Sequence, residues 1–314
     1  MRTLLVLALT ACATEDLVAP TVDDDPRLPA LDINGTRLHV DIRGPDGAPA
    51  IIFLHGGPGG DFRYALELGD ATAPGALVAD HRLVFWDQRG SGLSRRHDRG
   101  DISIDHYFAD LVALVDAVSP DRPVVLVGHS WGGPYAAWYL AHHPDRVRGA
   151  VLIDPQALTH SLYVEAGTAA DFELFGEWLT DPLWQRTIIS PDDHARADFL
   201  LASLELYRIP RFHNDIIAPL FRPGAVVFRD LAFRWFEDTP YDFTPGLADF
   251  PRPITILAGT DDEVLGYDFQ KKQLPLFRDA TLVPLPGDGH NDPVGVSARR
   301  TIELVRAYLD EVEP

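Results

Sequence analysis

A serine, a histidine and two adjacent aspartates stand where a mechanism of nucleophilic hydrolysis would need them. Ser130 lies in the segment Gly128-His129-Ser130-Trp131-Gly132, which has the Gly-x-Ser-x-Gly form of a nucleophile elbow. The apolar run 124–127 before it predicts a buried strand, and residues 134–140 after it predict a helix. The sharp turn between them needs small neighbours, which Gly128, Gly132 and Gly133 supply. We therefore predict that Ser130 is a nucleophile.

A nucleophilic serine needs a base to take its proton and a carboxylate to orient that base. His290 follows the expected strand 281–285 in a loop whose glycines, Gly287 and Gly289, let the histidine return over the sheet edge. Asp261 and Asp262 follow another expected strand, 254–258. Neighbouring loop residues usually point to different sides, so one of the two should face His290, and composition does not say which.

The glycine-rich segment 55–60 follows the strand that ends at Leu54, where main-chain N–H groups could approach a reacting carbonyl. The amide of Trp131, directly after the nucleophile, would be a second oxyanion donor. No Gly-Lys-Ser/Thr follows the glycines, which disfavours a phosphate-binding loop. The sequence also has no His-Glu-x-x-His motif and no cysteine cluster, so we expect neither a metal nor another cofactor.

Strand and helix patterns alternate along most of the chain, which predicts an α/β fold with a mostly parallel sheet and helices on both faces. Asn34-Gly35 predicts a hairpin where the folded domain opens. The pattern predicts a first half of the core over 31–155, a helical insertion over 156–248 that would serve as a lid, and a second half over 249–314.

The first 30 residues read as a targeting segment. Residues 1–11 resemble a bacterial lipoprotein signal peptide, Cys12 is the expected lipidated residue, and 12–30 would continue as a flexible tether. This predicts a lipid-anchored protein of the bacterial cell envelope, in contact with the membrane only through that anchor; the alternative is a cytoplasmic protein with a misassigned start. The net charge of −20 disfavours nucleic acid as a partner.

Three motifs resemble the proline iminopeptidase group of the α/β-hydrolase superfamily: His55-Gly-Gly-Pro-Gly-Gly60, Asp87-Gln-Arg-Gly-Ser-Gly92 and Gly128-His-Ser-Trp-Gly-Gly133. The resemblance covers about 31–154 and 253–312 and implies the α/β-hydrolase fold. It also implies that Asp262 orients His290, and that Gly57 and Trp131 are the oxyanion donors.

Members of that group hold the free amine of their substrate with lid glutamates, and Trp235-Phe236-Glu237 resembles such a segment. Glu237 and Trp235 are therefore candidate substrate-binding residues. The expected activity is release of an N-terminal proline or small apolar residue from a short peptide or amide. The alternatives are a carboxylesterase or lactonase acting on a small molecule with the same triad, and a tethered binding protein without catalysis. Serine at the elbow disfavours epoxide hydrolase chemistry, which uses aspartate there.

Overall fold

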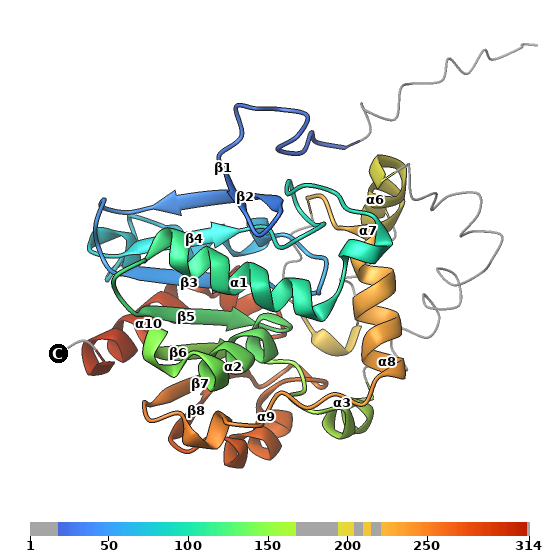
Figure 1. Ribbon diagram of the computed structural model, residues 1–314. Helices are drawn as coiled ribbons and strands as arrows, with labels where there is room; N and C mark the ends of the chain where they lie inside the picture. The colour runs from blue at the N-terminus through green and yellow to red at the C-terminus, as the bar shows by residue number, and fades with distance from the viewer. Residues whose placement is uncertain (1–17, 168–193, 204–209, 215–220, 313–314) are drawn as a thin grey trace, which may run out of the picture.

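Figure 1 presents the computed structural model, which describes residues 18–167, 194–203, 210–214 and 221–312. Its centre is an eight-stranded sheet in which the first two strands pair antiparallel and the second pairs antiparallel with the fourth, while every later neighbour is parallel. The strand order is β1-β2-β4-β3-β5-β6-β7-β8. The predicted mostly parallel α/β architecture is confirmed. The strands are β1 Ala30–Ile33, β2 Thr36–Arg43, β3 Ala50–Leu54, β4 Arg82–Trp86, β5 Val124–His129, β6 Val147–Ile153, β7 Ile254–Gly259 and β8 Ala280–Leu285.

The hairpin predicted at Asn34-Gly35 joins β1 to β2. Both turn residues have positive φ, 44° for Asn34 and 69° for Gly35. A two-residue hairpin turn of this kind suits Asn-Gly, because these residues enter the left-handed region at low cost. The local sequence therefore sets the register of the first two strands, in which Ile33 pairs with Thr36.

Alternate residues of the central strands enter two separate hydrophobic cores. On β3, Ile52 and Leu54 pack into the core formed with helices α1 (Ile104–Val118), α2 (Gly132–His142) and α9 (Tyr267–Gln273). Ile51 and Phe53 pack on the opposite face, against helix α10 (Ala298–Val312) and the short helical segment Phe62–Gly69. Both faces of the sheet are thus covered, as a parallel sheet requires.

The chain between β6 and β7 is the segment predicted as a helical insertion, and we call residues 156–248 the insertion. Figure 1 shows its helices along one end of the sheet, the end toward which β5 points. Because β5 ends immediately before Ser130, the insertion lies on the side of the sheet that carries the predicted site. The described helices are α3 His160–Ala166, α6 His194–Ser203, α7 Ala225–Val227, the π-helical turn Phe228–Trp235 and α8 Phe236–Asp238.

The N-terminal stretch departs from the flexible tether predicted over 12–30. Val22 is fully buried and donates its N–H to the Leu93 carbonyl at 2.8 Å. Asp23 forms an ion pair with Arg95 at 2.7 Å. The part of the tether after residue 17 is therefore packed on the domain, because the backbone of Val22 and the side chain of Asp23 bind the loop after β4. Cys12 and the predicted signal peptide lie outside the described residues.

Within the described ranges, none of the helices combines the length and the apolar character that crossing a bilayer requires.

Candidate active site

Ser130 occupies the turn between β5 and α2 in a left-handed backbone conformation, with φ 53°. Its N–H donates to the Ile153 carbonyl at 3.0 Å, and its own carbonyl accepts from Gly133 and Gln156 at 2.9 and 3.0 Å. A non-glycine residue with positive φ is uncommon and strained, and here these hydrogen bonds hold it in place. The side chain remains partly exposed, so the turn presents its hydroxyl to a ligand.

The glycines around Ser130 are required by close backbone contacts. A Cβ on Gly132 would overlap the Leu54 carbonyl of β3, and one on Gly128 would overlap the Gly132 carbonyl. A Cβ on Gly133 would overlap Pro155, which follows β6. The turn is therefore wedged between the ends of neighbouring strands, which explains the three glycines that marked it in the sequence.

His290 and Asp262 form a buried hydrogen-bonded pair at the same edge of the sheet. The Nδ1–H of His290 donates to Asp262 Oδ2 at 2.8 Å, and the side chains are 4% and 0% exposed. Asp262 Oδ1 accepts the N–H groups of Val264 and Leu265 at 2.8 and 3.0 Å. Because Nδ1 carries the proton, Nε2 of His290 keeps a lone pair that can accept one.

The neighbouring carboxylate, Asp261, is exposed and accepts a hydrogen bond from the Thr260 hydroxyl at 3.0 Å. Of the two aspartates left open by composition, Asp262 is the one that faces His290. The hydroxyl of Ser130 and Nε2 of His290 are not hydrogen-bonded to each other among the described contacts, and catalytic contacts are commonly long before substrate binds.

The loop after β3 holds Gly57 in a conformation that other residues rarely adopt, with φ 126°. A Cβ there would lie 2.7 Å from the amide nitrogens of Gly59 and Gly60. His55 fixes the start of the loop, because its Nδ1–H donates to the Gly56 carbonyl at 2.9 Å while Nε2 accepts from Gln88 N–H at 3.1 Å. Burial lowers the pKa of His55, consistent with this neutral form.

Both predicted oxyanion donors lie at this edge of the sheet, Trp131 at the start of α2 and Gly57 after β3. A Cβ on Gly56 would lie 3.1 Å from Cβ of Ser130, so the loop directly borders the elbow. Among the described residues, neither the Gly57 nor the Trp131 amide donates to another group of the chain. The two N–H groups can therefore serve a ligand.

A second buried carboxyl group, Asp154, lies beside the pair. It follows β6 with φ 40°, and its Oδ1 accepts the Gly259 N–H at 2.9 Å. Its Oδ2 is buried and has no hydrogen-bond partner among the described residues. Burial, helped by the negative charge of Asp262, raises the pKa of Asp154 well above its ordinary value. Burial thus favours the neutral acid form of Asp154.

Asp154 was not among the predicted site residues, although its position directly after a strand that ends at the same edge is a signal in the sequence. Asp154, Asp262 and His290 are also a set of side chains whose potential metal-ligand atoms all lie within 4.8 Å of one another. All three residues are buried, and two of them, His290 and Asp262, are hydrogen-bonded to each other.

Segments of the insertion lie directly against the site loops. The ring of Phe212 stacks on His290 with centroids 4.2 Å apart, and the Phe212 carbonyl accepts the His290 N–H at 2.8 Å. Phe236 packs edge-on against Trp131 at 5.4 Å. Gly224 donates its N–H to the Gly59 carbonyl at 2.8 Å. The insertion thus touches the loop that carries His290, which we call the base loop, the elbow at Ser130, and segment 55–60, which we call the glycine loop.

The two candidate substrate-binding residues of the insertion lie on either side of Phe236. Trp235 is partly buried and stacks on Tyr241 and Phe243, with centroids 5.3 and 6.1 Å apart. Glu237 is exposed, and its backbone carbonyl accepts a hydrogen bond from His160 Nε2 at 3.2 Å. These contacts of Trp235 and Glu237 lie within the insertion, so their link to the triad stays a prediction.

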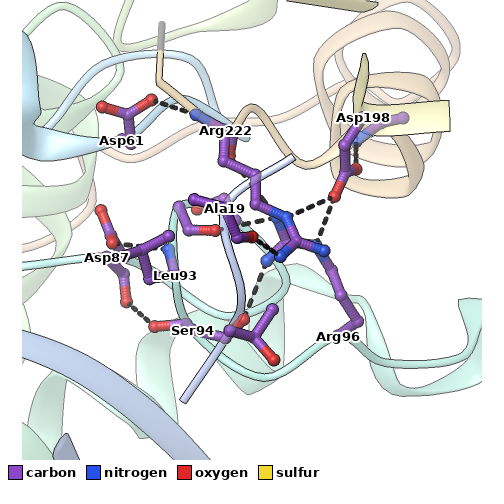
Figure 2. A network of polar contacts seen from close by, with 12 residues as sticks. Ala19, Asp61, Asp87, Leu93, Ser94, Arg96, Asp198 and Arg222 are labelled. Carbon is purple, nitrogen blue, oxygen red and sulfur yellow. Dashed lines mark hydrogen bonds and ion pairs between the residues drawn. The ribbon is translucent and has the colours of Figure 1, made fainter. Parts of the chain in front are cut away.

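Two buried aspartates fasten the insertion to the rest of the domain (Figure 2). Asp198 of α6 accepts hydrogen bonds from Arg96, outside the insertion, at 2.8 Å and from Arg222, within it, at 3.2 Å. Asp61, at the end of the glycine loop, accepts the N–H groups of Phe221 and Arg222 at 2.7 and 3.2 Å. Burial and the nearby charge of Asp87 raise the pKa of Asp61 to about 7.

Comparison with known proteins agrees with this geometry. The sequence profile of a family described as alpha/beta hydrolase fold matches residues 49–294. The bifunctional esterase/perhydrolase of Acinetobacter calcoaceticus is 29% identical over 273 residues, which cover 80% of this chain and 88% of that protein. The proline iminopeptidase of Saccharolobus solfataricus is 36% identical over 103 residues, 32% of each chain.

Among solved structures, a proline iminopeptidase-related protein of Thermus thermophilus matches with a TM-score of 0.61 and 25% identity. The alignment covers 91% of this chain and 97% of that one. Similarity to the esterase/perhydrolase sequence therefore extends over much more of the chain than similarity to the Saccharolobus peptidase sequence.

Proposed function

The chain belongs to the alpha/beta hydrolase fold family, and we propose that it is a serine hydrolase that cleaves carboxylic esters through an acyl-enzyme. In this proposal Ser130 is the nucleophile, His290 the general base and acid, and Asp262 the carboxylate that orients His290. The amides of Gly57 and Trp131 bind the oxyanion. The observation that carries the proposal is the partly exposed Ser130, held at φ 53° on the same sheet edge as the buried pair of His290 and Asp262.

The first half of the reaction transfers the acyl group to the enzyme. Nε2 of His290 takes the hydroxyl proton of Ser130 as Oγ bonds to the ester carbonyl carbon. The carbonyl oxygen becomes negatively charged and accepts hydrogen bonds from the two amides. The bond from carbon to the leaving oxygen then breaks, and the alcohol departs with the proton that His290 had taken.

The second half releases the acid. Water gives a proton to Nε2 of His290 as its oxygen bonds to the acyl carbon, and the same amides hold the second oxyanion. Collapse of this intermediate breaks the bond to Ser130 Oγ, which regains its proton from His290. The negative charge of Asp262 stabilises the imidazolium formed in each half.

An ester substrate is favoured because a relative that matches 80% of the chain is named an esterase/perhydrolase. Release of N-terminal proline is the second candidate, supported by the 36% identity to a proline iminopeptidase over 103 residues. That activity needs an anchor for the substrate's amine, and Glu237 is the residue expected to provide it. Its exposed position supports this role less than the sequence suggested.

Paired chromogenic substrates separate the two candidates. The wild type should hydrolyse p-nitrophenyl butyrate in preference to proline p-nitroanilide, and Ser130→Ala should lose both this activity and labelling by a fluorophosphonate probe. Preference for the anilide, together with a selective loss of that activity in Glu237→Gln, would establish the peptidase instead. Undiminished labelling of Ser130→Ala would contradict both candidates.

We also propose that the insertion acts as a lid and that Cys12 carries a lipid anchor. Contacts of Phe212, Gly224 and Phe236 with the three site loops support the role of the insertion as a lid.

The proposal of a lipid anchor at Cys12 rests on the resemblance of residues 1–11 to a bacterial lipoprotein signal peptide. Membrane fractions of cells that express the wild type should contain the protein, and Cys12→Ser should move it to the soluble fraction; a soluble wild type would argue against the anchor.

A further inference from the structure

Tyr64 and His129 connect the three loops of the proposed active site by an unbroken chain of hydrogen bonds. The Gly56 N–H donates to the Tyr64 hydroxyl oxygen at 2.8 Å. The Tyr64 hydroxyl lies 2.8 Å from His129 Nδ1, and His129 Nε2 lies 2.9 Å from the His290 carbonyl oxygen. Gly56 precedes Gly57, His129 precedes Ser130, and the last acceptor belongs to the base itself.

The chemistry of the end groups fixes the direction of every hydrogen bond. A carbonyl oxygen only accepts, so His129 Nε2 must carry a proton and donate it to His290. In the neutral ring Nδ1 is then an acceptor, so the Tyr64 hydroxyl must donate to it. The Tyr64 oxygen is left to accept from Gly56 N–H. All three hydrogen bonds therefore point the same way from donor to acceptor, from the glycine loop through Tyr64 and His129 to the base loop.

His129 is held in the neutral state that this chain requires. Its side chain is buried, and burial lowers its pKa well below the ordinary value, with the adjacent His290 adding to the effect. The two imidazole rings lie 4.9 Å apart. Because His290 becomes positively charged during the proposed reaction, a charged His129 at this distance would oppose catalysis.

The space between these groups leaves little freedom. A Cβ on Gly56 would lie 3.1 Å from Ser130 Cβ, 3.3 Å from the Tyr64 hydroxyl and 3.4 Å from His129 Nδ1. The Tyr64 ring also packs edge-on against His129, with centroids 5.4 Å apart. Tyr64 thus borders Gly56 on the side where Gly56 meets the elbow.

We propose that Tyr64 and His129 are positioning residues that hold the Gly57 amide and the His290 loop in register with Ser130. The inference rests on the proposed function, since it assigns these residues to the same acyl transfer. Tyr64 acts through the backbone of the glycine loop, and His129 through the backbone of the base loop. Each supports hydrogen bonds that strengthen as the oxyanion forms, so their loss should lower kcat more than it changes KM.

Tyr64→Phe tests the proposal, with Tyr308→Phe as its matched control. Tyr308 donates its hydroxyl to the Pro253 carbonyl at 2.7 Å, so this control also removes one buried hydroxyl donor, on α10. For the ester substrate we expect Tyr64→Phe to lower kcat about ten- to hundredfold and KM to stay within about threefold. Tyr308→Phe should leave both within about twofold.

A tetrahedral inhibitor gives a second readout that a merely structural role would not move. An alkyl trifluoromethyl ketone forms an oxyanion on Ser130, so its affinity for Tyr64→Phe should fall in proportion to kcat/KM. Two substitutions of His129, by Gln and by Leu, extend the test even if Tyr64→Phe folds poorly. His129→Gln keeps one donor and one acceptor and should bind the inhibitor at least about tenfold more tightly than His129→Leu.

Wild-type kcat and inhibitor affinity in Tyr64→Phe, or equal affinities in the two His129 variants, would overturn the inference. These failures are distinguishable from failure of the proposed function. If Ser130→Ala is inactive while Tyr64→Phe behaves as wild type, only the positioning role falls. If Ser130→Ala remains active, the proposed function falls as well.

Discussion

The sheet edge that carries Ser130 and the insertion above it are held by different kinds of contact. At the edge, main chain touches main chain so closely that Gly128, Gly132 and Gly133 have no room for a Cβ. The insertion adds buried side-chain charges to its main-chain contacts, with Asp198 binding Arg96 and Asp61 binding the amides of Phe221 and Arg222. The site geometry is therefore built into the backbone, whereas attachment of the insertion also depends on a few buried charges.

This difference separates two ways of losing function. A change at the edge should disturb catalysis itself, because the catalytic groups move with the backbone. A change at the buried charges should weaken the attachment of the insertion and lower the free energy of unfolding. Four predictions test this contrast.

The largest expected effect distinguishes the two buried carboxyl groups at the edge. Asp262→Asn should lower kcat/KM for an ester about a thousandfold or more, because the orienting charge on His290 is lost. Asp154→Asn should change it less than about tenfold, since an amide resembles the neutral acid that burial favours at this position. Steady-state kinetics of both variants provide the measurement. Similar losses in the two variants would mean that Asp154 is charged or that it shares the orienting role.

The next effect concerns the fastening of the insertion. Asp198→Asn leaves Arg96 and Arg222 without their buried counter-charge, and breaking a buried ion pair costs about 3–5 kcal/mol. Asp268→Asn is the control, because its ion pair with Lys271 is exposed and should contribute less than about 1 kcal/mol. Urea unfolding followed by circular dichroism measures both. Equal stability of the two variants would remove Asp198 as the fastening point.

Crowding at the elbow is tested by Gly132→Ala. The added methyl would overlap the Leu54 carbonyl, which should destabilise the protein by about 1–3 kcal/mol or more. The control is Gly100→Ala, because a Cβ at Gly100 meets nothing within 4 Å. Thermal unfolding and ester hydrolysis are measured together, and both should fall only in Gly132→Ala. Unchanged melting of that variant would show that the elbow has more room than the structure gives it.

The last prediction, a gradual change spread over several pH units, links the two regions through pH. Asp61 has a pKa of about 7, above its ordinary 3.8, so the folded state binds its proton more tightly than the unfolded state. The stability it contributes is present at low pH and is lost as pH rises from about 4 to 7, with a slope of at most about 1.4 kcal/mol per pH unit. Unfolding free energies at several pH values should show this loss in the wild type relative to Asp61→Asn. If the unfolding free energy of the wild type instead increased relative to that of Asp61→Asn as pH rises, the raised pKa of Asp61 would be contradicted.

Much of the fold could be predicted because its signals are local. Asn34-Gly35 determines a hairpin turn through its tolerance of positive φ. The apolar run at 124–127 and the glycines after it marked β5 and the elbow. The error over residues 18–30 has an equally physical reason. Acidic residues and prolines favoured a flexible tether, but Val22 and Asp23 bind a loop about 70 positions away, which composition does not reveal.

The sequence by itself determined the parallel α/β architecture and brought Ser130, His290 and a post-strand aspartate to one edge, because parallel strands end on the same side of a sheet. The family resemblance pointed to Asp262 rather than Asp261, and the structure has Asp262 facing His290. Only the tertiary structure decided that Asp154 lies beside them and that Tyr64 reaches His129. Each of these contacts joins residues distant in sequence and depends on the orientation that a single side chain adopts. Hydrophobic periodicity places an element, but it does not orient a loop side chain.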